Sequence, residues 1–246
     1  MIAAVLAVLV LFGAHSAKAA ECSNLTHAGN RYTVCEVDPA RQELRLFLKD
    51  GAGRLLGQFN RIDDALAGDG LRLTFAMNAG MYHKDRSPVG HYVENGTEQM
   101  RVISNAGPGN FGLLPNGVFC IRPGRADVIE TLRYLETAPD CTFATQSGPM
   151  LVIDGALHPR FLPDSTSRYI RNGVGTTADG SRAVFVISRN AVTFHDFGSL
   201  FRDVLGMPNA LYFDGNISRL YAPGMNRHDS GFPMGPVVGV VAAPDE

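Results

Sequence analysis

The sequence predicts an α+β fold, a single domain built on a mixed or antiparallel sheet with few helices and long loops rich in glycine and proline. Three observations predict this fold. Short apolar runs rich in β-branched and aromatic residues outnumber helical patterns, and strands do not alternate with helices. The chain has 27 glycines and 14 prolines, residues that shape turns and loops. Hydrophobic residues make up 45% of the chain and charged residues 19%, which favours one large buried core.

Residues 1–20 have the pattern of an export signal. Ile2–Phe12 is an apolar run too short to span a bilayer comfortably as a helix, and Ala17-Lys18-Ala19 follows it as an A-x-A cleavage pattern. An uncleaved anchor is the alternative, because the usual positive charge ahead of the apolar run is missing. We expect cleavage, an exported protein that is periplasmic or secreted, a mature domain over residues 21–246, and no membrane span after cleavage.

Nine segments carry the pattern expected of β-strands, and turns that contain glycine separate several of them. They are Tyr32–Val37, Leu44–Leu48, Leu71–Met77, Gly90–Glu94, Val118–Ile121, Leu151–Ile153, Ala183–Ser188, Leu211–Phe213 and Val237–Ala242. Helical patterns are fewer. Ile62–Leu66 carries acidic residues near its start, and Ser199–Leu205 places three apolar side chains on one face. The glycine- and proline-rich stretch from Asn105 to Gly117 is expected to be a structured loop.

Four cysteines predict disulfides. An even number suits an oxidising compartment, and four cysteines allow three pairings. We favour Cys22–Cys35 and Cys120–Cys141, because each pair closes a short loop. A zinc site is the alternative, but no C-x-x-C motif or neighbouring histidine pair supports it.

The charge balance bears on partners. A formal net charge of −2 gives no electrostatic reason to expect a nucleic acid or an anionic membrane as a partner. The histidines are scattered and do not form an H-x-x-x-H ligand set. We therefore predict no nucleic acid partner, no metal and no cofactor.

The segment Asn209–Ser218 contains the strongest candidate for an active-site residue. The apolar run Leu211–Phe213 ends in Asp214 and Gly215, an arrangement that brings a carboxylate to the rim of a core. Burial there should raise the pKa of Asp214 from its ordinary value of about 4. A turn that only ends a strand is the alternative. Candidates for a second carboxylate are Asp154, Asp196 and Asp229.

A similar strand end lies at Met77–Tyr82. The amide of Asn78 can donate and accept hydrogen bonds, Gly80 permits a tight turn with positive φ, and Tyr82 can stack or form a hydrogen bond. The alternative is an Asx-turn that closes the strand. Convergence of this segment with the one around Asp214 would build a pocket.

A third segment of this kind is Gln146-Ser147-Gly148-Pro149. A serine nucleophile is disfavoured, because Thr145 and Pro149 occupy the glycine positions of the G-x-S-x-G motif. Ser147 is more plausible as a hydrogen-bond donor to an oxyanion, with backbone N–H groups beside it.

Arg168 and Arg171 lie three residues apart, just before a strand that contains glycine. A guanidinium is always charged and matches phosphate oxygens with two hydrogen bonds. The alternative is a surface salt bridge. The weak overall charge and the polar, glycine-rich surroundings favour a ligand role.

Taken in order, four of these motifs resemble those of the phosphodiester glycosidase family, in particular its small exported bacterial branch. They are Asn78–Tyr82, Gln146–Pro149, Arg171–Gly175 and Phe213–Ser218, within a region of resemblance over roughly residues 70–242. The resemblance implies active-site roles for Asn78, Gly80, Ser147, Gly148, Arg171, Asp214 and Ser218. Together with the residue chemistry above, it leads us to assign catalysis to Asp214, Arg171 and Ser147, and substrate binding to Asn78, Gly80, Tyr82, Gln146, Gly148, Arg168, Gly215 and Ser218.

The sequence thus predicts an exported hydrolase that cleaves a glycosidic bond to a phosphodiester or a related carbohydrate phosphate. Arg171 would hold the phosphate, and Asp214 would act as an acid–base group or stabilise an oxocarbenium-like transition state. The alternative is a periplasmic glycan-binding or envelope-assembly module without turnover. Asn216 and Ile217 motivate it, because they replace two glycines of the family pattern. A cell-wall serine or amidase-type hydrolase would require Ser147 to be nucleophilic.

Overall fold

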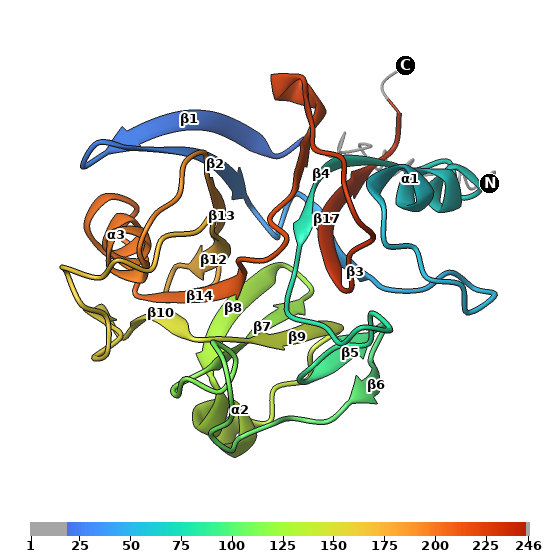
Figure 1. The fold of residues 1–246 in the computed structure, drawn as a ribbon. Coiled ribbons are helices and arrows are strands. Elements are labelled where there is room, and N and C mark those ends of the chain that lie inside the picture. The colour runs from blue at the N-terminus through green and yellow to red at the C-terminus, as the bar shows by residue number, and fades with distance from the viewer. Residues whose placement is uncertain (1–18, 245–246) are drawn as a thin grey trace, which may run out of the picture.

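The computed structural model describes residues 19–244, which fold into three antiparallel sheets and three short α-helices (Figure 1). The α+β class and the single domain are confirmed, but the strands form three sheets where one was expected. Each of the nine predicted strands overlaps an observed strand. Apart from Ala19 and Ala20, the predicted export signal lies outside the described residues.

The first sheet has seven strands, and every neighbouring pair in it is antiparallel. In spatial order these are β1 (Glu21–His27), β2 (Asn30–Val37), β13 (Ala183–Ser188), β12 (Asn172–Thr176), β14 (Asn209–Asp214), β10 (Met150–Ile153) and β11 (Ala156–Leu157). The strand β14 therefore lies inside the sheet, between β12 and β10, and its C-terminal residue is Asp214.

Two five-stranded sheets complete the fold. The second sheet has the order β16 (Arg227–His228), β15 (Leu220–Ala222), β4 (Arg72–Asn78), β17 (Val237–Ala242) and β3 (Glu43–Phe47). The third has the order β6 (Thr97–Met100), β5 (Tyr92–Glu94), β9 (Phe143–Ser147), β7 (Gly117–Arg122) and β8 (Arg125–Glu130).

The helices are short and cover the outer faces of the sheets (Figure 1). They are α1 (Phe59–Ala67), α2 (Thr131–Thr137) and α3 (Phe194–Ser199), which continues into a π-helical turn, Leu200–Val204; a 3-10 turn spans Pro223–Met225. Both predicted helices exist, and α2 is additional. It is too short for a clear apolar period, and its N-cap is Glu130, whose carboxylate accepts hydrogen bonds from two backbone N–H groups. No helix among residues 19–244 is long and apolar enough to span a membrane.

All three sheets contribute to one central core. Phe185 of β13 lies with its ring centroid 5.0 Å from that of Phe75 of β4 and 5.7 Å from that of Phe119 of β7. All three side chains are fully buried. Because each ring belongs to a different sheet, burial of apolar surface at this point holds the three sheets together.

Both predicted disulfides are confirmed. Cys22–Cys35 joins paired positions of β1 and β2, and Cys120–Cys141 joins β7 to the segment that follows α2. These pairings exclude zinc coordination by the same four sulfur atoms.

Replacing Cys120 and Cys141 together with alanine is expected to lower the free energy of unfolding by about 2–4 kcal/mol, because the bond restricts the unfolded chain. Urea denaturation of the oxidised wild-type protein and of the double variant measures the change. An unchanged unfolding midpoint would show that the bond adds nothing to the packing of α2 against the third sheet.

Candidate active site

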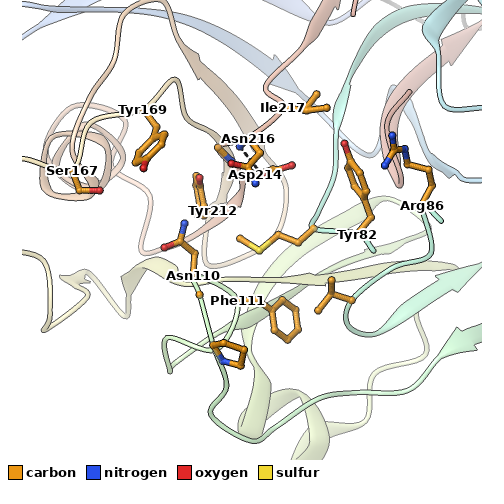
Figure 2. A pocket seen from close by; sticks show the side chains of 15 residues that line it. Tyr82, Arg86, Asn110, Phe111, Ser167, Tyr169, Tyr212, Asp214, Asn216 and Ile217 are labelled. Carbon is orange, nitrogen blue, oxygen red and sulfur yellow. Dashed lines mark hydrogen bonds between the residues drawn. The ribbon is translucent and has the colours of Figure 1, made fainter. Parts of the chain in front are cut away.

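A cavity of about 660 Å³ opens where β14 ends (Figure 2). Its walls come from four places in the chain, which are residues 81–89 between β4 and β5, residues 108–111 between β6 and β7, residues 167–169 before β12, and residues 212–217 at the end of β14. We refer to this cavity as the cleft. Its volume lies in the range typical of sites for small organic ligands.

Asp214 lies on the floor of the cleft, as the strand-end pattern predicted. Only 7% of the surface of Asp214 is exposed, and its Oδ1 accepts hydrogen bonds from the backbone N–H groups of Gly215 (2.6 Å) and Asn216 (2.9 Å). Burial raises the pKa of Asp214 above its ordinary value, and the backbone N–H groups of residues 215–217 offset part of this rise. The result is a fixed carboxylate that binds a proton more tightly than an exposed aspartate does.

A register shift between β12 and β14 positions Asp214. Asn172 pairs with Asp214, but the next residue, Gly173, pairs with Tyr212, so one residue of β14 is left out of the ladder. Such a bulge changes the direction of the side chains around it. Gly173 is required here, because a Cβ at this position would lie 2.4 Å from the carbonyl oxygen of Leu211.

Two buried asparagines support the backbone of Asp214 from below. The amide oxygen of Asn172 accepts a hydrogen bond from the backbone N–H of Asp214 (3.0 Å), and its Nδ2 donates to Oδ1 of Asn78. The same oxygen of Asn78 accepts the backbone N–H of Arg219 (3.0 Å). Asn78 therefore lies beneath the cleft floor, fully buried, and acts on Asp214 through Asn172.

The segment 145–149 does not line the cleft. Ser147 is fully buried, and its hydroxyl donates to the carbonyl oxygen of Phe213 (2.8 Å), which ties β9 to β14. A Cβ on Gly148 would lie 2.7 Å from the side chain of Asn116, so this glycine allows close packing. Ser147 thus contacts the strand that carries Asp214, Gly148 packs against Asn116, and neither residue lines the cleft.

Gln146 is also committed to internal contacts. Its Oε1 accepts the backbone N–H groups of His91 and Ile103 (3.0 Å each), and its Nε2 donates to the carbonyl oxygen of Ile103 (2.7 Å) and the hydroxyl of Thr131 (3.0 Å). With 2% of the residue exposed, the amide connects loops of the third sheet and does not reach the cleft.

The two predicted phosphate-binding arginines lie outside the cleft wall. Arg171 is 1% exposed, and its guanidinium donates to the carbonyl oxygens of Val192 (3.0 Å) and Ser167 (3.1 Å) and packs over the ring of Phe194. Arg168 forms an ion pair with Asp196 (3.3 Å). The guanidinium carbon also lies 5.4 Å from the ring centroids of both Tyr169 and Tyr212, so Arg171 packs behind two residues of the cleft wall and supports the segment 167–169.

Four other predicted residues lie in or beside the cleft. Tyr82 and Gly215 line it. A Cβ on Gly215 would lie 2.0 Å from the hydroxyl oxygen of Tyr212, so only glycine fits there. Gly80 has a positive φ of +155°, in a bend where a tight turn was expected. The hydroxyl of Ser218 donates to the carbonyl oxygens of Ile170 (3.1 Å) and Asp214 (3.2 Å), and so closes the turn behind the carboxylate.

None of the three candidate second carboxylates reaches the cleft. Each pairs with an arginine elsewhere, Asp154 with Arg133 (2.8 Å), Asp196 with Arg168 and Asp229 with Arg227 (2.9 Å). Among residues 19–244, Asp214 is the only carboxylate that lines the cleft.

Sequence reasoning missed several residues of the cleft. Arg86, Phe111, Tyr169 and Tyr212 all line it. Tyr169 and Tyr212 belong to segments that were singled out for other residues, and Phe111 belongs to the glycine- and proline-rich stretch expected to be a structured loop. Arg86 belongs to no recognisable motif. The one feature of the sequence that could have indicated it is the turn-forming composition around it.

Comparisons with known proteins agree with this architecture. The family model described as phosphodiester glycosidase matches residues 72–241. The Escherichia coli (strain K12) protein named uncharacterized protein YigE is 34% identical over 188 residues, which cover 76% of this chain and 73% of that protein.

Two solved structures share the fold. One is the catalytic domain of zebrafish N-acetylglucosamine-1-phosphodiester alpha-N-acetylglucosaminidase auto-inhibited by its pro-peptide, with a TM-score of 0.59 and 14% identity, covering 90% of this chain and 81% of that one. The other is a hypothetical protein from Synechocystis, with a TM-score of 0.59 and 12% identity, covering 91% of this chain. This chain spans 62% of the Synechocystis protein, less than two thirds of its length.

Proposed function

This chain belongs to the phosphodiester glycosidase family, and from that premise we propose that it is a hydrolase that cleaves a glycosidic bond to a phosphodiester or a related carbohydrate phosphate. One observation carries the proposal. A buried carboxylate with a raised pKa, Asp214, lies on the floor of a cleft with aromatic walls, where a sugar ring can pack. This is the chemistry that attack on an anomeric carbon needs.

In the proposed reaction, Asp214 acts as a general base. Water attacks the anomeric carbon as the bond from that carbon to the phosphate oxygen breaks, and the electron pair of the broken bond leaves with the phosphate. Asp214 accepts a proton from the attacking water, and its negative charge stabilises the positive charge that develops on the sugar ring. A phosphate ester leaves readily as an anion, so the reaction does not require a second carboxyl group to protonate it.

The tyrosines supply hydroxyl donors and ring faces for the sugar. Tyr82, Tyr169 and Tyr212 surround Asp214 in the cleft (Figure 2). Burial and the charge of Asp214 raise the pKa of Tyr82, so its hydroxyl remains protonated and can donate a hydrogen bond at neutral pH. Asn78, Asn172, Ser147 and Ser218 then act as positioning residues, because they hold the backbone around Asp214.

Activity on sugar 1-phosphodiesters is expected to rise with pH through the pKa of Asp214, because the base must be ionised. Since burial raises that pKa, the acid limb of kcat/KM should lie above the ordinary aspartate value of about 4. Measuring kcat/KM from pH 3 to 8 on several sugar 1-phosphodiesters tests the proposal. If none of these substrates releases a phosphate ester, the proposed hydrolase function is wrong.

The single carboxylate of the cleft also favours a second candidate, a glycan-phosphate binding module without turnover. Most glycosidases use two carboxyl groups, and only Asp214 lines this cleft within the described residues. Saturable binding of a sugar phosphate with no product after prolonged incubation would support this alternative over the hydrolase.

We further propose that the protein works outside the cytoplasm. Two disulfides suit an oxidising compartment, and the pattern of residues 1–20 suits an export signal. Mass spectrometry of the N-terminus of protein recovered from the periplasm or the medium tests the expected cleavage before residue 21.

A further inference from the structure

We propose that Arg86, together with Tyr82, forms an anion-binding subsite in the cleft that holds the phosphate group of the substrate. The inference deepens the proposed function and rests on it for the identity of the substrate. It replaces Arg171, whose guanidinium is buried, as the residue that recognises phosphate.

Arg86 is the only guanidinium that lines the cleft within the part of the chain that the structure describes. Figure 2 shows Arg86 beside Tyr82, with Asp214 on one side of this pair and Tyr169 farther away beyond Asp214. The central carbon of the guanidinium lies 5.1 Å from the centroid of the Tyr82 ring. Across the cleft, the ring of Tyr169 forms an aromatic wall for the sugar, the carboxylate of Asp214 comes next, and the pair of Tyr82 and the Arg86 cation follows.

The charge of Arg86 has no carboxylate partner among residues 19–244. The one hydrogen bond that its guanidinium donates there is from Nη1 to the carbonyl oxygen of Lys84, at 3.3 Å. The adjacent Asp85 is already engaged, because its Oδ1 accepts the hydroxyl (2.6 Å) and the backbone N–H (3.0 Å) of Ser87. A guanidinium with unused donors in a cleft can bind two oxygens of one phosphate.

The backbone at Arg86 adopts a conformation that arginine rarely takes. Its φ is +72°, inside a turn closed by hydrogen bonds from the N–H of Arg86 to the carbonyl of His83 (2.9 Å) and from the N–H of His83 to the carbonyl of Ser87 (2.8 Å). Glycine would fit this conformation more easily. The turn therefore carries a long cationic side chain at a position where local backbone preference favours glycine.

A cation is needed in this cleft because Asp214 and a phosphate are both negative. Without compensation, the carboxylate would repel the substrate across a partly buried space. Burial is the main cause of the raised pKa of Tyr82. The charge of Asp214 raises this pKa further, and the charges of Arg86 and Arg219 lower it. Arg86 thus offsets the repulsion and stabilises the charge that grows on the leaving phosphate.

Arg86→Gln in the full chain tests the subsite by binding, and every protein in the titration also carries Asp214→Asn so that the sugar phosphate is not hydrolysed. Isothermal titration with glucose 1-phosphate and with glucose is expected to show tighter binding of the phosphate by the wild-type protein. The variant should bind glucose 1-phosphate about tenfold or more weakly, with glucose binding unchanged, because a charge-assisted contact is lost. Lys84→Gln is the matched control, since it removes one positive charge from the same turn without touching the cleft, and it should behave like the wild-type protein.

Arg86→Gly separates binding from folding. Because glycine suits the backbone at this position, this variant should keep its thermal stability and still lose phosphate binding. Equal affinity of the wild-type protein for glucose and glucose 1-phosphate, or unchanged phosphate affinity in both Arg86 variants, would overturn the inference.

Turnover distinguishes this inference from the proposed function. Arg86→Gln should lower kcat/KM on a sugar 1-phosphodiester more than on the neutral 4-nitrophenyl glycoside of the same sugar. If the protein binds phosphate through Arg86 but hydrolyses neither compound, the subsite is supported and the hydrolase function is refuted.

Discussion

Asp214→Asn is expected to reduce hydrolysis of a sugar 1-phosphodiester by about 10²–10⁴-fold, the range of a lost general base. The substitution is isosteric, and the amide oxygen can still accept the N–H groups of Gly215 and Asn216 that now bind Oδ1. The change therefore removes the proton acceptor and the negative charge while the turn keeps its geometry. Initial rates of phosphate-ester release measure the effect.

The same variant should be at least as stable as the wild-type protein at neutral pH. Burial raises the pKa of Asp214, so the native state binds more protons than the unfolded chain between the two pKa values. The free energy of unfolding consequently falls as pH rises through this window, and it remains lower above it. Asparagine has no proton to lose, so the stability advantage of the variant should appear at pH 7 and vanish below about pH 4.

The control for this experiment is Asp154→Asn, which changes the charge equally at an exposed residue paired with Arg133. This variant should retain turnover. Full activity of Asp214→Asn would remove Asp214 from the mechanism, and an equal loss in both variants would indicate a general effect of charge.

Asn172→Ala is expected to lower the free energy of unfolding by about 2–5 kcal/mol and to reduce kcat. The side chain is fully buried and connects Asn78 to the backbone N–H of Asp214. Truncation leaves the N–H of Asp214 as a buried donor without a partner, at a cost of about 1–3 kcal/mol, and removes one of the two hydrogen bonds that Oδ1 of Asn78 accepts, at a cost of about 0.5–1.5 kcal/mol. The lost packing of a fully buried side chain adds to both. Truncation also frees the turn that aims the carboxylate.

Urea denaturation and steady-state kinetics of the Asn172 variant measure both effects. Asn105→Ala, at an exposed asparagine, is the matched control and should change neither quantity. A stable variant with unchanged kcat would show that the two asparagines fill space and do not position Asp214.

Several features of this protein follow from short-range pattern. The strand Leu211–Phe213 and its terminal Asp214 were predictable, because an apolar run followed by Asp-Gly ends a buried strand in a turn. The two disulfides were predictable, because each closes a short loop. The positive φ at Gly80 was predictable from glycine alone. None of these depends on which sheets meet.

The set of side chains that line the cleft did depend on how the three sheets pack together. Arg171 and Ser147 have the chemistry of site residues, but both side chains are buried. Arg171 binds the backbone carbonyls of Val192 and Ser167, and Ser147 ties β9 to β14 across two sheets. Arg86 reaches the cleft because the connection from β4 to β5 folds toward the end of β14.

The sequence by itself determined the α+β class, nine of the strands, the cysteine pairs and the carboxylate at the end of β14, because alternation and turn chemistry act over a few residues. Only the tertiary structure decided that Asp214 is accompanied by Arg86 and three tyrosines and not by Arg171 and Ser147. The physical reason is that the direction of a side chain depends on sheet register, on the bulge opposite Gly173 and on how three sheets share one core, and these are properties of the whole chain.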